Sequence, residues 1–347
     1  MIIVLKPETP EDQIKTVVAE VQRLGFEPRR LDGVAHTVIA CIGDERGKSG
    51  VQEAFEGLQG VEKVVAIMEE YKLVASEGRQ RTIFNVDDVP VGGDEIVVIA
   101  GPCSVETEEQ IVESARAVAR AGARMLRGGA FKPRTSPYAF QGHGEKGLQW
   151  LQSAKRETSL PIVTEVMTPS DVELVARYAD VLQIGARNVQ NYHLLREVRK
   201  TDRPVLLKRG MSTTLKEFLM AAEYVMSEGN PHVIMCERGI RTFETATRNT
   251  LDLNAVPVLK EKSHLPVAVD PSHGVGIRRW VPDLAVASVA VGADVVVLEV
   301  HPDPDKAWSD GSQTLSPELF MKTMDRMRKV AVAVGRNIAS ALPVPAV

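Results

Sequence analysis

The chain has 347 residues, of which 44% are hydrophobic and 25% charged, and its formal net charge at pH 7 is −4. This composition is typical of a globular protein, and the mild negative charge argues against a nucleic-acid or membrane-surface partner. The three cysteines are widely spaced and the N-terminus lacks the pattern of a secretion signal, so we expect a cytoplasmic protein with reduced thiols.

The first 70 residues predict a small domain of their own. Ile14, Val17 and Val21 recur at helical spacing, and Asp32-Gly33 predicts a turn between two strands. The elements expected in chain order are a strand, a helix, two strands, a helix and a strand, at 1–6, 10–24, 26–33, 35–43, 51–61 and 61–68. The order βαββαβ is that of a ferredoxin-like sandwich.

From residue 71 onward the sequence shows a different pattern of apolar and polar residues. Residues 71–94 are polar and predict a linker that ends in a small hairpin, whereas from 95 to 338 short β-branched runs alternate with amphipathic stretches. Strands are expected at 95–101, 123–129, 160–166, 180–186, 204–210, 232–238, 265–271 and 294–300. Eight such units fit a closed (β/α)8 TIM barrel, whose usual size is ~250 residues. An open doubly wound sheet is the alternative, but no Gly-x-Gly-x-x-Gly follows the first strand.

The most apolar stretch of the chain lies near its end, at 284–300. It is interrupted by Gly292 and Asp294, so it predicts a buried helix followed by a buried strand rather than a membrane span. Residues 339–347 predict a tail.

Polar side chains follow the predicted strands at their C-terminal ends, where barrel enzymes build their sites. The cationic ones are Arg127, Lys132, Arg134, Arg187, Lys208 and Arg238. Each alone could be a solvated rim residue. Together in one pocket they would repel one another unless anions filled it, and arginine's planar fork suits carboxylates and phosphates. The pattern therefore predicts a site for substrates that carry several negative charges.

A second group combines one thiol, one imidazole and two carboxylates: Cys103, His273, Glu299 and Asp310. Thiolate and imidazole ligands disfavour Mg²⁺ and Ca²⁺, whereas the mixed set suits one divalent transition ion, Mn²⁺, Fe²⁺, Co²⁺ or Zn²⁺. No local Cys-x-x-Cys or His-x-x-x-His spacing supports such a site. A small core cysteine and a histidine held in a turn remain the alternative.

Several segments together resemble the 3-deoxy-D-arabino-heptulosonate 7-phosphate (DAHP) synthase family. They are IAGPCSVE, RGGAFKPRTSPYAFQG, TEVMTP, QIGARN, LLKRGM, ERGIRTFE, VDPSHG and LEVHPDPDKAWSDG. The front domain resembles the ferredoxin-like extension found in one branch of that family. The resemblance implies a metal-dependent condensation of phosphoenolpyruvate with erythrose 4-phosphate and water, the first step of the shikimate pathway to the aromatic amino acids.

The resemblance also implies roles for single residues. Phosphoenolpyruvate would be held by Arg127, Lys132, Glu165, Ala186, Arg187, Lys208 and Arg238, and erythrose 4-phosphate by Arg134, Thr135 and Ser136. The metal would be bound by Cys103, His273, Glu299 and Asp310. Lys132 and Glu165 are candidates for proton transfer, and Asp270 would orient His273 or lie near the metal-bound end of the sugar.

Two other functions stay open at this point. The related 3-deoxy-D-manno-octulosonate 8-phosphate synthase uses arabinose 5-phosphate, and its second loop typically reads Lys-Ala-Asn-Arg-Ser where this chain has KPRTS. A non-catalytic effector-binding barrel would be expected to lack a metal ligand or Lys208, and all are present. The resemblance further implies feedback inhibition by tyrosine or phenylalanine at residues 1–70, and a homotetramer.

Overall fold

In the computed structural model, residues Met1–Glu70 form one compact unit, an antiparallel sheet that packs against two helices. The strands run in the order β2-β3-β1-β4, and the pairings of β1 with β3, β1 with β4 and β2 with β3 are all antiparallel. The elements are β1 (Ile2–Leu5), α1 (Glu11–Arg23), β2 (Glu27–Asp32), β3 (Thr37–Ile42), α2 (Val51–Glu56) and β4 (Val61–Val65). The buried residues of α1 are Ile14, Val17 and Val21, at the spacing that predicted the helix. The ferredoxin-like prediction is confirmed.

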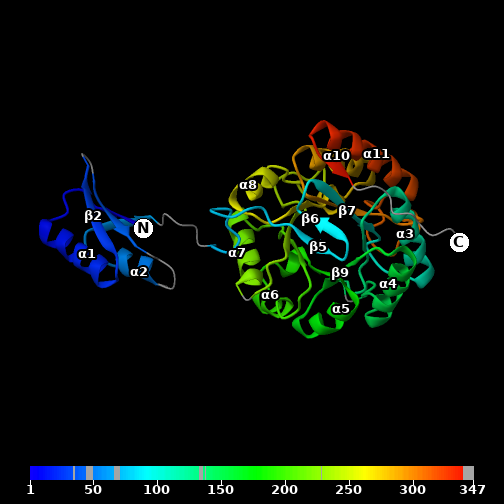
Figure 1. Cartoon of the computed structure of the whole chain (residues 1–347), viewed down its shortest axis with the longest axis horizontal. Helices are drawn as coiled ribbons and strands as arrows, with labels where there is room; N and C mark the ends of the chain where they lie inside the picture. The colour runs from blue at the N-terminus through cyan, green and yellow to red at the C-terminus, as the bar shows by residue number, and fades with distance from the viewer. Residues whose placement is uncertain are drawn as a thin grey trace. The chain divides into compact units, whose positions relative to one another are not determined.

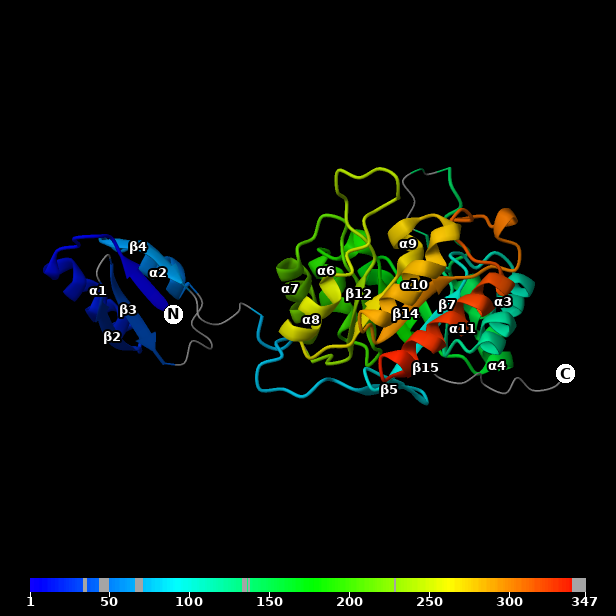
Figure 2. The ribbon, with the colours of Figure 1, turned by 90° about the horizontal axis from the view of Figure 1, so that it is seen from above.

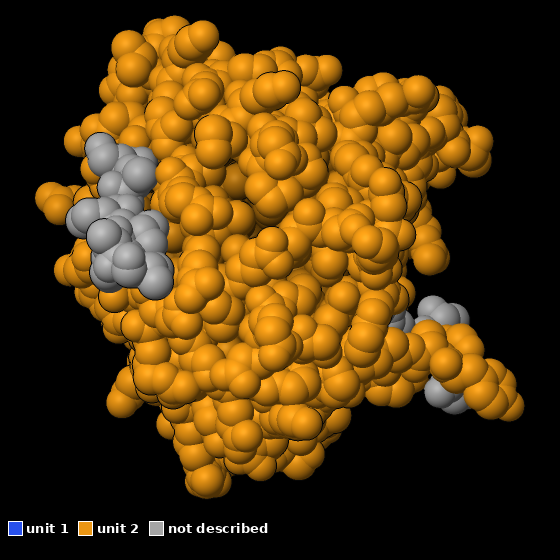
Figure 3. Space-filling model, turned by 90° about the vertical axis from the view of Figure 1, so that its right-hand side faces the viewer, with its two compact units in different colours: residues 1–70 blue, residues 71–347 orange. Residues whose placement is uncertain are grey.

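Residues Tyr71–Val347 form the second compact unit, drawn in orange in Figure 3. The residues that the structure describes are 1–33, 36–43, 50–65, 71–132, 136, 138–227 and 229–338. Within these ranges, no helix is both long enough and apolar enough to cross a membrane.

A closed parallel barrel makes up most of the second unit. Its strands are β7 (Glu95–Gly101), β8 (Met125–Arg127), β9 (Ile162–Val166), β10 (Val181–Ile184), β11 (Val205–Lys208), β12 (Val233–Glu237), β13 (Val267–Val269) and β14 (Val295–Glu299). Each strand pairs with the next, and β14 pairs with β7 over five residues, which closes the ring. A short strand, β15 (Asn337–Ile338), adds to β7. The barrel is confirmed, and the open sheet is excluded.

Helices surround the strands, as Figure 1 shows in a view along the barrel. They are α3 (Glu108–Ala121), α4 (Glu145–Thr158), α5 (Val172–Tyr178), α6 (Tyr192–Val198), α7 (Leu215–Met226), α8 (Ala255–Lys262), α9 (Pro271–Val275), α10 (Val281–Ala290) and α11 (Pro317–Ala333). Their buried residues pack against the outward-facing residues of the strands, for example Val98 and Leu126, in one continuous core.

A hairpin closes the N-terminal end of the barrel. Its strands are β5 (Phe84–Val86) and β6 (Val89–Val91), and in Figure 1 it lies across the centre of the ring. The side chains of Phe84, Val86, Val89 and Val91 form one buried cluster with the inward-facing residues of the strands, such as Val97. In the side view of Figure 2, β5 lies on the opposite side of the barrel from α9. The hairpin thus fills the end of the barrel opposite the C-terminal ends of the strands.

Residues directly after Tyr71 lie against the barrel. Tyr71 and Val74 are buried in the outer core. The Glu223 carboxylate on α7 accepts hydrogen bonds from the backbone N–H groups of residues 72, 73 and 74, at 2.9–3.0 Å. This segment, which we call the strap (residues 71–74), is therefore attached to α7.

Candidate active site

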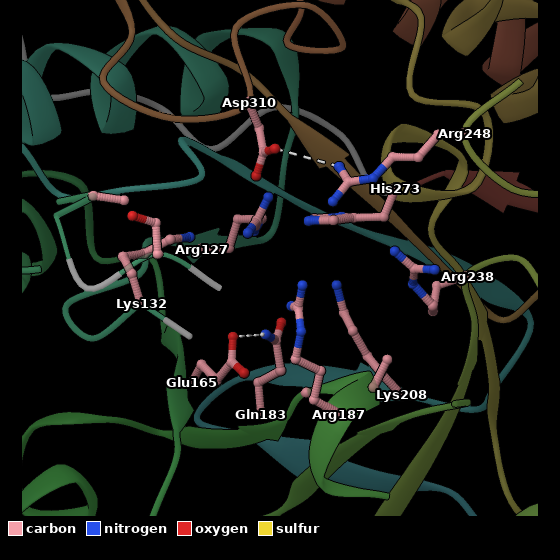
Figure 4. A pocket seen from close by; sticks show the side chains of 14 residues that line it. Arg127, Lys132, Glu165, Gln183, Arg187, Lys208, Arg238, Arg248, His273 and Asp310 are labelled. Carbon is pink, nitrogen blue, oxygen red and sulfur yellow. Dashed lines mark hydrogen bonds and ion pairs between the residues drawn. The ribbon is translucent and has the colours of Figure 1, made fainter. Parts of the chain in front are cut away.

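A cavity of about 360 Å³ lies at the C-terminal ends of the barrel strands. Its walls come from β8 to β11 and the loops that follow the strands (Figure 4). The described residues that line it are Arg127, Lys132, Ser136, Ala139, Glu165, Gln183, Gly185, Ala186, Arg187, Lys208, Arg238, Arg248, His273 and Asp310. Six of these side chains are cations and two are carboxylates, so the wall carries a surplus of positive charge.

The residues that the sequence suggested for phosphoenolpyruvate all line this cavity. They are Arg127, Lys132, Glu165, Ala186, Arg187, Lys208 and Arg238. Of the three suggested for the sugar phosphate, Ser136 also lines it. Arg134 and Thr135 lie outside the described residues.

Two of the cations are paired with buried carboxylates. Arg127 Nη1 donates to Glu299 Oε1 at 2.7 Å, and Lys208 Nζ donates to Asp270 Oδ2 at 2.5 Å. Burial alone would raise the pKa of Asp270, but the charges of His273 and Lys208 hold it well below its usual range. Asp270 therefore stays ionised, and each carboxylate fixes the head of its cation at the cavity wall.

Arg238 has no such partner. Its side chain is 5% exposed, and no carboxylate pairs with it among the residues that the structure describes. Among the described residues, the one hydrogen bond that its guanidinium donates goes to the backbone oxygen of Gly239 at 3.4 Å. Burial lowers the pKa of Arg238. A buried cation that no carboxylate contacts is costly, and among the described residues Arg238 feels the charge of Asp270 without an ion pair to it. Its guanidinium could therefore pair with an anion in the cavity.

Four potential metal ligands meet at one edge of the cavity. The ligand atoms of Cys103, His273, Glu299 and Asp310 all lie within 4.8 Å of one another. His273 Nε2 is 3.2 Å from Glu299 Oε1, and the Cys103 thiol donates to Asp310 Oδ2 at 2.9 Å. The residues come from loops or strand ends after β7, β13 and β14, which the barrel brings to one face.

The four side chains fit a divalent transition ion. Two atoms bound ~2.2 Å from one ion in a tetrahedral arrangement lie ~3.6 Å apart, so small rotations of these side chains would suffice. The donor set of one sulfur, one imidazole nitrogen and two carboxylates suits Mn²⁺, Fe²⁺, Co²⁺ or Zn²⁺ better than Mg²⁺ or Ca²⁺. Burial and then the charge of Glu299 raise the pKa of the Cys103 thiol to about 11, so binding an ion there would displace its proton.

Hydrogen bonds to Asp270 fix the orientation of the His273 ring. Its Nδ1 lies 2.7 Å from Asp270 Oδ2, and its backbone N–H donates to Asp270 Oδ1 at 3.0 Å. A carboxylate that accepts from one ring nitrogen fixes the tautomer and leaves the other nitrogen free to bind a metal. Asp270 thus orients two residues of the site, because it also accepts a hydrogen bond from Lys208.

Lys132 links the metal cluster to the rest of the cavity. Its Nζ donates to Cys103 Sγ at 2.8 Å and to Cys103 O at 2.9 Å. The approach depends on Gly129, where an added Cβ would lie 2.5 Å from Cys103 O and 3.2 Å from Lys132 Nζ. The ammonium group therefore lies beside the sulfur and on the cavity wall.

Glu165 lies at the opposite side of the opening from Asp310 in Figure 4. Its Oε2 accepts from Gln183 Nε2 at 3.2 Å. An added Cβ at Gly185 would lie 2.0 Å from Glu165 Oε1, so only glycine leaves space for this carboxylate. Glu165 is thus a carboxylate held on the wall of the same cavity as the cations.

Three residues at the site were not assigned by sequence reasoning. Gln183 and Arg248 line the cavity, and Gln313 lies beneath the metal cluster, where its Nε2 donates to Glu299 Oε2 at 2.6 Å. Gln183 stands out in the sequence as a polar residue in an apolar strand, but no role was assigned to it. Arg248 and Gln313 lie in irregular loops, where no periodicity indicates which way a side chain points.

Comparison with known proteins adds evidence that does not depend on this geometry. Residues 70–334 match the model of the DAHP synthetase I family, and residues 1–69 match that of the DAHP synthase ferredoxin-like domain. The chain belongs to the DAHP synthase family. It is an enzyme of that family, and the branch with the ferredoxin-like front domain is the one it resembles along its whole length.

Relatives of this DAHP synthase family member include proteins of two kinds. A phospho-2-dehydro-3-deoxyheptonate aldolase of Thermotoga maritima is 48% identical, with 97% of this chain and 100% of that protein covered. A 2-dehydro-3-deoxyphosphooctonate aldolase of Syntrophotalea carbinolica is 33% identical over 74% of this chain and 98% of its own. The crystal structure of the T. maritima DAHP synthase superposes with a TM-score of 0.90 at 47% identity, covering 97% of this chain and 98% of that one.

Proposed function

We propose that this chain condenses phosphoenolpyruvate with erythrose 4-phosphate and water to give DAHP and inorganic phosphate. The observation that carries the proposal is the surplus of cations around one cavity, where Arg238 is buried without a carboxylate partner among the residues that the structure describes. Phosphoenolpyruvate brings a carboxylate and a phosphate, and the sugar brings a second phosphate. These anions supply the counter-charge that the wall lacks.

Each cation has a distinct task in this proposal. Arg187 and Arg238, which have no carboxylate partners among the described residues, would bind phosphoenolpyruvate by paired N–H donors. Lys208 and Arg127 are held by Asp270 and Glu299, so they would present fixed charges at either side of that substrate. Holding both reactants in one closed-ended cavity supplies the orientation that a condensation needs.

The bond changes are those of an aldol-type condensation. C3 of phosphoenolpyruvate attacks the aldehyde carbon of the sugar, water adds at C2, and phosphate leaves from the resulting hemiketal. Lys132 and Glu165 lie on the cavity wall and are the groups we propose for proton transfer to the new hydroxyl and from the water. A divalent ion at Cys103, His273, Glu299 and Asp310 would supply Lewis-acid polarisation of the aldehyde oxygen.

The use of erythrose 4-phosphate rather than arabinose 5-phosphate is supported by the degree of similarity. The heptonate aldolase of T. maritima is 48% identical over nearly the whole chain, whereas the octonate aldolase of S. carbinolica reaches 33% over 74% of the chain. The front domain also has its own match to a DAHP synthase domain model.

A metal-stripped assay tests the proposal. Phosphate release from phosphoenolpyruvate is measured with each sugar phosphate, before and after addition of Mn²⁺, Fe²⁺, Co²⁺ or Zn²⁺. We expect release with erythrose 4-phosphate, restored by these ions, and a seven-carbon product by mass. Release with arabinose 5-phosphate alone would favour the octulosonate reaction. No release with either sugar, together with retained binding of phosphoenolpyruvate, would indicate a non-catalytic binding protein.

We also propose that residues 1–70 bind tyrosine or phenylalanine and thereby inhibit the barrel. Support comes from the separate fold of this unit and from the family of its domain. The full chain should be inhibited by one of these amino acids, and a variant starting at Tyr71 should keep activity without inhibition. Equal inhibition of the full chain and of the shortened variant would contradict this proposal.

We further propose that the protein is cytoplasmic and forms a homotetramer. Analytical ultracentrifugation of the full chain would test the homotetramer.

A further inference from the structure

Gln313 lies directly beneath the candidate metal cluster without belonging to it. The residue is 1% exposed. It ends the turn that begins at Asp310, where the Gln313 N–H donates to Asp310 O at 3.2 Å. One short turn therefore supplies both a candidate ligand and a buried amide side chain.

The hydrogen bonds of Gln313 determine which way its amide points. One end of the amide meets the Glu299 carboxylate at 2.6 Å, and the other end meets Arg248 Nη1 at 2.9 Å. A carboxylate needs a donor and a guanidinium needs an acceptor. The NH₂ group must then face Glu299 and the oxygen must face Arg248, since the reverse orientation would place two acceptors together at Glu299 and two donors together at Arg248.

The contact with Gln313 restricts the rotation of Glu299. Glu299 Oε1 accepts from Arg127 Nη1 at 2.7 Å and lies 3.2 Å from His273 Nε2, while Oε2 accepts only from Gln313 among the described hydrogen bonds. The terminal torsion of a glutamate is broad and roughly two-fold. Donors at both oxygens hold that torsion, so Oε1 stays directed at the cluster.

Arg248 extends this network to two further candidate ligands. Its Nη1 also lies 3.3 Å from Asp310 Oδ1. Its backbone N–H donates to Val275 O at 3.0 Å, and the neighbouring Asn249 Nδ2 donates to His273 O at 3.0 Å. The loop after β12 is thus attached both to the turn of His273 and to the turn of Asp310.

We propose that Gln313 is a positioning residue for the metal site, which holds Glu299 in its ligating orientation and is itself held by Arg248. This inference rests on the proposed metal-dependent function. Partners of this kind behind a metal ligand typically change metal affinity by 10–100-fold. Gln313 does not line the cavity, so its effect reaches the substrates through the two residues it contacts, Glu299 and Arg248.

The test measures metal binding without turnover. The metal-stripped full chain is titrated with Co²⁺, and the charge-transfer absorption between cobalt and the Cys103 thiolate reports occupancy. Gln313→Met keeps the length of the side chain and removes both hydrogen bonds, and Gln313→Asn keeps the amide but is one methylene too short to span both partners. The matched control is Gln152→Met on α4, whose amide donates to Tyr178 O at 2.6 Å, outside the cavity.

We expect the dissociation constant for Co²⁺ to rise about 10–100-fold in both Gln313 variants and to be unchanged in the control. At saturating Co²⁺, the KM for phosphoenolpyruvate should stay close to that of the unaltered chain. A dissociation constant within twofold of the unaltered chain would overturn the proposal, whether or not the unfolding temperature falls. Failure of both variants to fold would assign Gln313 a structural role and overturn it too.

The two proposals fail in different ways. If the unaltered chain binds Co²⁺ with the thiolate band but releases no phosphate with either sugar, the proposed reaction is wrong and the role of Gln313 stands. If the unaltered chain shows no charge-transfer absorption between cobalt and the Cys103 thiolate, the proposed metal site is wrong, and the proposed role of Gln313 is wrong as well.

Discussion

Two neighbouring arginines should respond in opposite ways to the same substitution. Arg209 and Arg238 are each 5% exposed. Arg209 donates to Glu237 Oε2 and Asp252 Oδ2, both at 2.8 Å, and to Thr213 O at 2.9 Å. Arg238 makes only the 3.4 Å bond to Gly239 O among the described hydrogen bonds. Methionine keeps the aliphatic stem of either side chain and removes its charge.

The magnitudes follow from what each substitution leaves behind. Arg209→Met leaves Glu237, which is 0% exposed, without its cation, and we expect the free energy of unfolding to fall by about 3 kcal/mol. Arg238→Met removes a buried charge that no carboxylate contacts among the described residues, so the substrate-free protein should gain about 1 kcal/mol. For a domain of this size, these changes correspond to roughly 6 °C lost and 2 °C gained in the unfolding temperature.

Phosphoenolpyruvate should reverse the order of stability between the unaltered chain and Arg238→Met. Loss of the arginine should weaken binding by about 3 kcal/mol, or roughly 100-fold. At a concentration 100 times its dissociation constant, the substrate should stabilise the unaltered chain by about 2.7 kcal/mol and the variant by only ~0.4 kcal/mol. The unaltered chain would then be the more stable of the two.

Tryptophan fluorescence is a suitable assay, because Trp150, Trp280 and Trp308 are the three tryptophans of the chain and all lie in the second unit. Unfolding of the barrel is followed with and without phosphoenolpyruvate. A substrate-free Arg238→Met protein that is less stable than the unaltered chain, and that is stabilised equally by phosphoenolpyruvate, would refute the reasoning.

Other substitutions and treatments test further parts of the structure. Asp270→Asn removes the charge shared by Lys208 and His273, and steady-state kinetics should show kcat/KM lowered roughly 100-fold; a change below threefold would contradict the role of Asp270. Chelation of divalent ions should abolish DAHP formation, and the phosphate-release assay should show recovery with Mn²⁺ or Zn²⁺ but not with Ca²⁺; full activity in excess chelator would argue against the metal site. Glu223→Ala should release the strap from α7 and lower the free energy of unfolding by about 2 kcal/mol in urea denaturation. Glu173→Ala, which removes an exposed pair with Arg177 on α5, is its control and should leave the transition unchanged.

The sequence predicted the barrel well because its strands are short β-branched runs. Such a run can be recognised as a strand from its own residues, without knowing what it contacts in the fold. The predicted strand at 95–101 coincides with β7, and the others were placed one or two residues too wide at one or both ends, where Gly, Pro and Asp often begin the loops. The same order of strands indicated which polar side chains would share a face, since parallel strands end together.

Partners within the site could not be predicted in the same way. Arg127 and Glu299 are 172 residues apart in the chain, and which cation meets which carboxylate depends on side-chain directions at the barrel rim. The loops that carry Arg248 and Gln313 have no hydrophobic period, so neither residue differed from a solvated loop residue in the sequence. The strap was predicted as part of a linker for a similar reason: nothing in its polar neighbourhood reveals that Glu223, about 150 residues later, binds its backbone.

The hairpin of β5 and β6 closes one end of the barrel among the residues that the structure describes. Its apolar side chains pack with the inward-facing strand residues, so within those residues a charged molecule has no polar route through this end. A molecule that enters the cavity at the C-terminal ends of the strands would have to leave by the same opening, and a second molecule bound at the rim would slow its exchange.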